Sequence, residues 1–118
     1  MHALVIEDQW ILADLVEAAL GELGFDSVAI ASDEEQAVSL ALEKAPDLIT
    51  ADLRLGRGTG ISAVRRICKD RPVPVIYLTA EASELQAVQG AIIVRKPFAP
   101  ATLARAVTSA LRAATASG

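Results

Sequence analysis

Five polar side chains in this sequence end or directly follow short, mostly apolar runs, and together they could do chemistry. They are three carboxylates, a hydroxyl and an ammonium group: Glu7, Asp8, Asp52, Thr79 and Lys96. The runs before them are 3–6, 48–51, 75–78 and 92–95. A carboxylate at the tip of a buried strand is costly unless something uses it. If the runs are parallel strands of one sheet, all five groups meet at its carboxyl edge, where open α/β sheets place their sites.

Three carboxylates crowded at one edge repel one another, and a hard divalent cation with oxygen ligands relieves that repulsion. Mg²⁺ is the natural candidate. We expect it to take oxygens from Asp8 and Asp52 and from the backbone carbonyl of Arg54, and to keep some waters. Glu7 would act mainly through one of those waters.

With the metal bound, Asp52 has a free oxygen that can attack a phosphoryl group presented in line. The metal and Lys96 would offset the charge on the equatorial oxygens, and the product would be an aspartyl phosphate. Thr79 can then donate its hydroxyl to one phosphoryl oxygen, and Lys96 can contact another as a point charge. Each residue alone has an ordinary explanation as a helix cap, a strand end or a turn. Their joint occurrence favours a site.

Strand-like runs and apolar residues at helical spacing alternate along the chain. Strands are expected at 3–6, 28–31, 48–52, 75–79 and 92–95. Helices are expected at about 9–23, from a Ser32–Glu35 capping box to Ala45, at 60–69, and from Pro100 onward. Only sixteen residues separate Thr79 from Lys96, which leaves room for a shortened fourth helix at 83–89, with Ser83 and Gln86 as its capping box.

Five strands alternating with helices predict an α/β fold with a five-stranded, doubly wound parallel sheet. Right-handed crossovers favour the flavodoxin-like strand order 2-1-3-4-5. In that order the first and third strands are neighbours, so Glu7 and Asp8 would meet Asp52 where the strand order reverses. The predicted topology and the predicted site support each other.

Composition limits the class of protein. A chain of 118 residues that is 53% hydrophobic fits one domain, 1–118, with ample material for a core. No apolar run approaches the length of a membrane span, and no basic segment precedes a long apolar stretch at the N-terminus. These features predict a cytoplasmic protein that does not bind membranes.

Charge is divided unevenly along the chain. Residues 1–52 hold twelve acids and one base, whereas residues 53–118 hold three acids and ten bases, which gives the halves charges of −11 and +7. Six of the bases fall within eighteen positions: Arg54, Arg57, Arg65, Arg66, Lys69 and Arg71. A nucleic-acid surface is one explanation, but the whole chain is acidic and no aromatic side chains are interleaved for stacking. A solvated helix face is the better account, and we expect no direct nucleic-acid binding.

On these motifs the chain resembles a receiver domain of the bacterial two-component response regulators over essentially its whole length. The resemblance rests on elements in the family's order: Glu7-Asp8, Asp52, Gly60, Thr79-Ala80 and Lys96-Pro97-Phe98. It implies that Asp52 is the phosphoacceptor, with Glu7 and Asp8 as metal-binding acids. It also implies that Thr79 is the switch hydroxyl and that Lys96 contacts the phosphate. The segment 52–55 and the loop after it are similar to the receiver half of alphaproteobacterial general-stress-response regulators.

This chain departs from the family pattern at two places, and both concern signalling more than phosphorylation. Receivers usually carry Tyr or Phe three positions before the lysine, where this chain has Ile93, so no aromatic rotamer switch is available. The fourth helix is also shortened. Phosphorylation would act through Thr79 on Ala80 and Glu81, and so on the short helix.

The first functional interpretation is a single-domain response regulator that takes phosphate from a histidine kinase or phosphotransfer protein. It would signal by binding a protein partner or act as a phosphate sink. We expect no enzyme activity beyond self-phosphorylation and slow autodephosphorylation. The alternative is a phosphorylation-independent interaction module on a receiver scaffold, which Ile93 favours and the intact acid set opposes.

Two enzyme or cofactor classes fit less well. A Mg²⁺-dependent phosphatase with an Asp nucleophile usually needs a second acid two residues later, where this chain has Arg54. A nucleotide or flavin binder would not place Glu7-Asp8 where a phosphate must bind. The alanine-rich last helix could offer a flat surface for a dimer or pack closely on the sheet, and both remain open.

Overall fold

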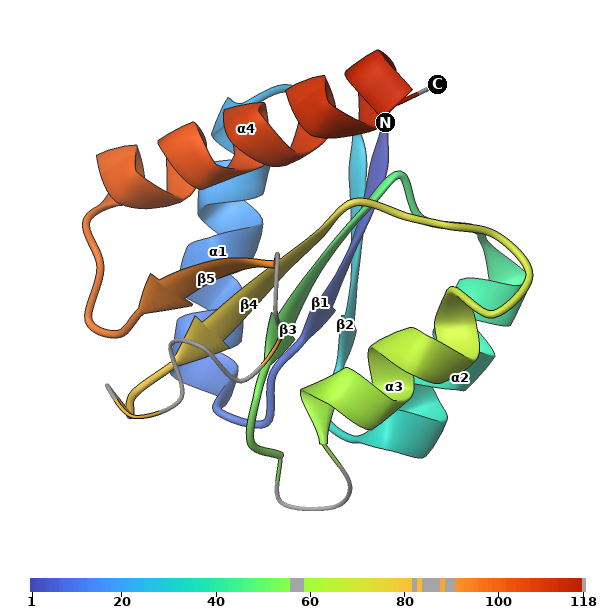
Figure 1. Ribbon diagram of the computed structural model, residues 1–118. Helices are drawn as coiled ribbons and strands as arrows, with labels where there is room; N and C mark the ends of the chain where they lie inside the picture. The colour runs from blue at the N-terminus through green and yellow to red at the C-terminus, as the bar shows by residue number, and fades with distance from the viewer. Residues whose placement is uncertain (56–58, 82, 84–87, 89–90, 118) are drawn as a thin grey trace.

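The computed structural model describes residues 1–55, 59–81, 83, 88 and 91–117, and the centre of this part of the chain is one parallel sheet (Figure 1). Its five strands are β1 (His2–Ile6), β2 (Ser27–Ala31), β3 (Leu48–Asp52), β4 (Val75–Thr79) and β5 (Ile92–Arg95). They lie in the order β2-β1-β3-β4-β5, and every neighbouring pair is parallel. The predicted fold class and strand order are therefore confirmed.

Helices cover both faces of the sheet. Those in the described part of the chain are α1 (Trp10–Glu22), α2 (Glu34–Glu43), α3 (Gly60–Ile67) and α4 (Pro100–Ser117). Helices α1 and α4 lie on one face and α2 and α3 on the other (Figure 1). Successive side chains of β1 alternate between the two cores, with Ala3 and Val5 on the α1–α4 side and Leu4 and Ile6 on the α2–α3 side. Burial on both faces explains why the strands read as continuous apolar runs.

Strand register brings the predicted site residues level with one another. The last pair between β1 and β3 stands one residue before Glu7 and Asp52. Asp52 in turn pairs with the residue before Thr79. Thr79 pairs with the residue before Lys96. Four strands therefore deliver four functional side chains to one edge of the sheet.

The start of α2 corrects one prediction. Its N-cap is Asp33, whose side chain accepts a hydrogen bond from the N–H of Gln36 at 2.8 Å. The capping box predicted for Ser32 and Glu35 is therefore wrong by one residue. Asp33 is as strong a cap as serine, and its extended backbone marks it as the last residue before the helix. The side chain of Gln36 points back toward the residue before the cap, where its Oε1 accepts hydrogen bonds from the N–H and the hydroxyl of Ser32.

Both α2 and α3 end two residues earlier than their apolar spacing predicts. Lys44, directly after α2, is extended with φ −148° and ψ 113°. Pro46 favours an early end, because the residue before a proline is disfavoured in the helical conformation. Helix α3 ends at Ile67, and the N–H of its C-cap, Cys68, donates the last hydrogen bond of that turn.

The connection between β4 and β5 carries the remaining sequence prediction. The expected short helix at 83–89, with its Ser83–Gln86 capping box, falls outside the described residues except for positions 83 and 88. In the part of the chain that is described, no helix combines the length and the apolar character needed to cross a membrane.

Candidate functional site

The carboxylates of Glu7, Asp8 and Asp52 gather at the carboxyl edge of the sheet, as the sequence predicts. One oxygen from each group lies within 4.8 Å of the others. Glu7 and Asp52 are buried, with 2% and 6% of their surface exposed, whereas Asp8 is exposed. Clustered carboxylate oxygens are the ligands that Mg²⁺ and other hard divalent cations take. The donor set therefore fits such an ion, and the exposed Asp8 leaves the cluster open to solvent.

Lys96 reaches this cluster from the end of β5. Its Nζ donates to Oδ2 of Asp52 at 2.8 Å and to Oε1 of Glu7 at 3.0 Å. The backbone fixes its position, because the N–H of Lys96 donates to the carbonyl of Thr79 at 2.7 Å. The Lys96–Pro97 peptide bond is cis. The ammonium group therefore bridges two of the three carboxylates.

Burial disfavours the charged forms of Glu7 and Lys96, whereas the hydrogen bonds of the ion pair favour them. Burial raises the pKa of Glu7 to about 7, and the nearby Asp52 carboxylate adds to that rise, against hydrogen bonds from Lys96 and from the N–H of Gln9. Burial lowers the pKa of Lys96, but its hydrogen bonds with Asp52 and Glu7 outweigh this, so the net shift is upward. Lys96 therefore stays charged, and Glu7 is the group of this pair that titrates near neutral pH.

The described residues on either side of the loop after Asp52 hold the end of β3. The N–H of Arg54 donates to Oδ1 of Asp52 at 3.1 Å, and Arg54 forms an isolated antiparallel bridge with Thr59. Gly60 then opens α3 so close to β3 that a Cβ built on it would stand 2.0 Å from the carbonyl oxygen of Asp52. Only glycine permits this approach, which explains why a glycine begins the helix. The phosphoacceptor candidate is thus held by a backbone N–H and a close backbone contact.

Thr79 lies at the end of β4 with its hydroxyl already engaged. Its Oγ1 accepts a hydrogen bond from the N–H of Glu81 at 3.1 Å, and lies 3.4 Å from the Glu81 carbonyl oxygen. Thr79 is buried, with 2% of its surface exposed. The hydroxyl thus closes the turn after β4 and is directly coupled to the position of residue 81.

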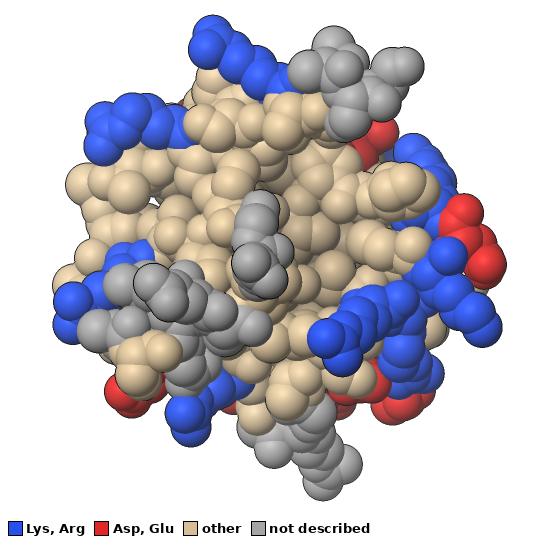
Figure 2. All heavy atoms as spheres, in the orientation of Figure 1, with Lys and Arg blue, Asp and Glu red and all other residues tan. Residues whose placement is uncertain are grey.

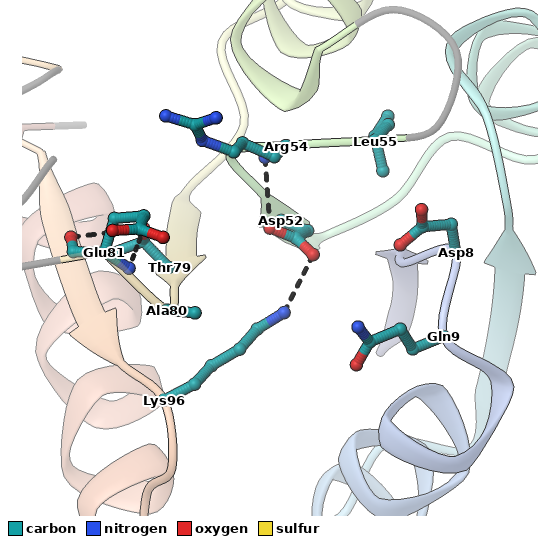
Figure 3. Close-up of a pocket in the computed structure, with 9 residues that line it drawn as sticks. All are labelled: Asp8, Gln9, Asp52, Arg54, Leu55, Thr79, Ala80, Glu81 and Lys96. Atoms are coloured by element: carbon teal, nitrogen blue, oxygen red, sulfur yellow. Dashed lines mark hydrogen bonds and ion pairs between the residues drawn. The ribbon is translucent and has the colours of Figure 1, made fainter.

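These groups line an open pocket of about 310 Å³ (Figure 3). Its lining residues are Asp8, Gln9, Asp52, Arg54, Leu55, Thr79, Ala80, Glu81 and Lys96. In Figure 3 the Lys96 side chain reaches from β5 toward the Asp52 carboxylate at the end of β3. The volume of this pocket is near the lower end of the range for small-molecule sites, about 300–1,000 Å³. Several of the residues that line it are charged. Such a pocket suits a small anionic group rather than an apolar ligand.

The sequence prediction missed one contributor to the site. Gln9 lines the pocket, and its N–H donates to Oε2 of Glu7 at 3.1 Å. The signal was present, since Gln9 stands two residues after Glu7 at the start of a helix, where free N–H groups are available. The predicted ligand role of the Arg54 carbonyl remains a prediction, because it depends on a bound ion.

Comparisons with known proteins agree with this geometry. A family model described as the response regulator receiver domain matches residues 3–108. The phyllosphere-induced regulator PhyR of Methylorubrum extorquens is 35% identical over 113 residues, covering 92% of this chain and 42% of that protein. The crystal structure of the response regulator PhyR from Brucella abortus has a TM-score of 0.90 and 31% identity, covering 98% of this chain and 49% of that one. The crystal structure of the anti-anti-sigma factor PhyR from Bartonella quintana has a TM-score of 0.84 and 31% identity, covering 99% of this chain and 51% of that one. This chain thus spans about half the length of these relatives, or less.

Proposed function

Since the chain belongs to the response regulator receiver domain family, we propose that Asp52 is its phosphoacceptor, in a Mg²⁺-dependent transfer from a histidine kinase or a phosphotransfer protein. The observation that carries this proposal is the setting of the Asp52 carboxylate. It lies in an open pocket with Lys96 at 2.8 Å and with oxygens of Glu7 and Asp8 within 4.8 Å. Among the described residues that line the pocket, Asp52 is the buried carboxylate, whereas Asp8 and Glu81 are exposed.

The transfer would be a displacement at phosphorus. An oxygen of Asp52 forms the new P–O bond while the P–N bond to the donor imidazole breaks, and the imidazole leaves with the electron pair. Mg²⁺, when held by Asp8, Asp52 and the Arg54 carbonyl, would supply positive charge that offsets the charge on the transferred group. Lys96 would turn part of its interaction from the carboxylate to a phosphoryl oxygen. The N–H of Arg54 already orients the carboxylate through Oδ1.

Thr79 would report the new phosphoryl group to the surface. Its hydroxyl now accepts from the N–H of Glu81. On phosphorylation its O–H would donate to a phosphoryl oxygen in place of the Glu81 carbonyl oxygen, which lies 3.4 Å away, and this exchange would displace residues 80 and 81. This is a local change in one hydrogen bond with a readout in the loop after β4.

The output would be binding to a protein partner, or storage of phosphate as a sink. The name of the Bartonella relative, anti-anti-sigma factor, describes that protein; a partner of the same kind is one candidate for this chain. A kinase or phosphotransfer donor would place the protein in the cytoplasm. Its only catalytic act would be to phosphorylate itself and slowly hydrolyse its own acyl phosphate.

A phosphorylation-independent interaction module is the second candidate, and Ile93 is the observation that favours it. Ile93 packs partly buried on the α2–α3 side of the sheet, where the family usually carries an aromatic residue. In this case the partner would bind equally well with and without phosphate on Asp52. The intact acid cluster and Lys96 argue for the phosphorylated form.

Intact-protein mass spectrometry with acetyl phosphate tests the proposal. We expect one phosphoryl adduct that needs Mg²⁺ and is lost in Asp52→Asn. Asp70→Asn, at an exposed acid away from the pocket, is the matched control and should keep the adduct. An adduct that survives in Asp52→Asn would reject the phosphoacceptor role of Asp52. If the native chain forms no adduct with acetyl phosphate or with a panel of histidine kinases, that result would also reject the role and would favour the second candidate.

A further inference from the structure

Glu34 opens α2, but its side chain reaches α3. Its Oε2 accepts a hydrogen bond from the hydroxyl of Ser62 at 3.0 Å and another from Nη1 of Arg66 at 2.8 Å. The two helices lie beside each other on one face of the sheet (Figure 1). Glu34 therefore connects the first turn of α2 to the first and last turns of α3.

The same carboxylate contacts the residue directly before α3. Hydrogen bonds lower the pKa of Glu34 against a rise from burial: first that from Arg66, then that from the Ser62 hydroxyl, with the backbone N–H of Thr59 as a further donor. Thr59 is the N-cap of α3, and its Oγ1 accepts from the N–H of Ser62 at 3.0 Å. Glu34 thus contacts the cap of α3 as well as its first turn.

Thr59 connects these contacts to the end of β3. It forms the isolated antiparallel bridge with Arg54. The N–H of Arg54 in turn donates to Oδ1 of Asp52 at 3.1 Å. A chain of three contacts therefore joins Glu34 to the Asp52 carboxylate, although Glu34 lies on a helix that contributes no residue to the Asp52 pocket.

Glu35 provides a comparison within the same turn of α2. It also pairs with Arg66, at 2.6 and 3.2 Å, but among the described residues it has no hydrogen bond with Thr59 or Ser62. Its side chain is 80% exposed, whereas that of Glu34 is 17% exposed. Figure 2 shows acidic and basic side chains next to each other on the side of the molecule where α2 and α3 lie. Exposed ion pairs of this kind contribute little, so the contact with Thr59 is what distinguishes Glu34.

We propose that Glu34 is a positioning residue for the phosphorylation of Asp52, because it holds Thr59 and so fixes the Arg54 backbone that orients the Asp52 carboxylate. The inference rests on the proposed function, since it concerns the same transfer. Without the Glu34 contact, the Arg54 backbone would sample other orientations. Misplaced groups slow a transfer even when the reacting residues are intact.

Amide hydrogen exchange of the free chain, followed by NMR, tests the hold without phosphate or Mg²⁺. The N–H of Arg54 is protected while it donates to a carboxylate oxygen. We expect it to exchange about fivefold faster in Glu34→Ala, as for the loss of one hydrogen bond. Glu35→Ala removes the same charge from the same turn and should leave this exchange unchanged. The amide of Val5, buried in the central strand β1, reports global opening and should change less than that of Arg54.

The rate of adduct formation with acetyl phosphate and Mg²⁺ tests the consequence. We expect it to fall about fivefold in Glu34→Ala and to stay at the native value in Glu35→Ala. Glu34→Gln keeps an acceptor oxygen for Thr59 and Ser62, so it should recover most of the rate, which a purely electrostatic role would not allow. Ser62→Ala should slow the reaction less, and the double variant with Glu34→Ala should be no slower than Glu34→Ala alone.

The outcomes separate this proposal from the one on which it rests. Equal exchange at Arg54 in Glu34→Ala and Glu35→Ala would show that Glu34 does not hold this backbone. Faster exchange with a native rate of adduct formation would show that the hold does not serve the reaction. Either result would overturn the positioning role and leave Asp52 as the phosphoacceptor. A native chain that forms no adduct would reject the proposed function, and the positioning role with it.

Discussion

The Nζ of Lys96 lies 2.8 Å from Oδ2 of Asp52, although the two residues stand 44 positions apart in the chain. The same ammonium group lies 3.0 Å from Oε1 of Glu7. Two buried carboxylates thus share one cation, and the third carboxylate of the cluster, Asp8, is exposed. The ammonium group offsets part of the negative charge of the cluster, so binding of Mg²⁺ must be measured against the stabilisation that Lys96 already provides.

Lys96→Met tests that balance. Without Mg²⁺, removal of the cation leaves Glu7 and Asp52 buried beside each other, and we expect a loss of about 2 kcal/mol in the free energy of unfolding at pH 8. Mg²⁺ should stabilise this variant more than the native chain, because no ammonium group competes with it. Urea unfolding with and without Mg²⁺ measures both effects.

Lys44→Met is the control for that experiment. Lys44 is exposed and donates to the hydroxyl of Ser27, so its loss should change the free energy of unfolding little and the Mg²⁺ response not at all. Equal Mg²⁺ stabilisation in Lys96→Met and the native chain would show that the ion binds outside the carboxylate cluster.

Gly60→Ala tests the close approach between α3 and β3. A Cβ at this position would stand 2.0 Å from the backbone carbonyl oxygen of Asp52, so the backbone must move. We expect a loss of about 3 kcal/mol in the free energy of unfolding, with slower phosphorylation because Asp52 moves as well. Gly21→Ala is the matched control. It lies inside α1, where the new Cβ would meet no atom within 4 Å beyond its chain neighbours and the backbone of its own helix, and the free energy of unfolding should rise by about 0.5–1 kcal/mol. Similar stabilities for the two variants would contradict the packing described here.

Glu7 should make stability depend on pH. Its pKa is raised from an ordinary 4.5 to about 7, so between these values the folded chain binds the proton more often than the unfolded chain. Stability from this group is therefore full below about pH 4.5 and is lost as pH rises through 7. Unfolding curves from pH 5 to 8 without Mg²⁺ should show this decline, and Glu7→Gln should flatten it. Added Mg²⁺ should oppose the decline, because the ion binds the deprotonated form. A decline that is unchanged in Glu7→Gln would assign it to another group.

Thr79→Val and Thr50→Val form a matched pair in one sheet. The Oγ1 of Thr50 is buried with no hydrogen-bond partner among the described residues, so its replacement should raise the free energy of unfolding by about 1 kcal/mol. Thr79 accepts from the N–H of Glu81, so its replacement should cost about 1 kcal/mol. Thr79→Val should still accept phosphate, yet the amide signal of Glu81 should no longer shift when it does. A normal shift of that signal would show that Thr79 does not transmit the state of Asp52.

Much of the fold was predictable because local rules and topology agree. Apolar runs of four or five residues alternate with segments whose apolar residues have helical spacing, and this alternation predicts a parallel sheet. Right-handed crossovers then favour the observed strand order. Residues at the carboxyl ends of neighbouring strands must then meet, which is why the sequence alone predicts that Glu7, Asp52, Thr79 and Lys96 lie together. The errors are local. Asp33 and Ser32 are both good caps, and sequence alone does not decide between them.

The interactions that tune the site were not predictable, because they depend on side-chain reach. The position of Lys96 in the sequence does not show that its ammonium group contacts Glu7 as well as Asp52. Nor does the sequence show that the Thr79 hydroxyl is held by the next turn, or that Gly60 touches the Asp52 carbonyl.

The most direct measurement of the central claim is the position of the phosphoryl group. The chain would be treated with acetyl phosphate and Mg²⁺, reduced with borohydride to convert an aspartyl phosphate into homoserine, digested, and mapped by peptide mass spectrometry. We predict homoserine at position 52 alone, and none when Mg²⁺ is removed. Conversion at Glu7, Asp8 or any other acid, with Asp52 intact, would contradict the assignment of Asp52 as the phosphoacceptor.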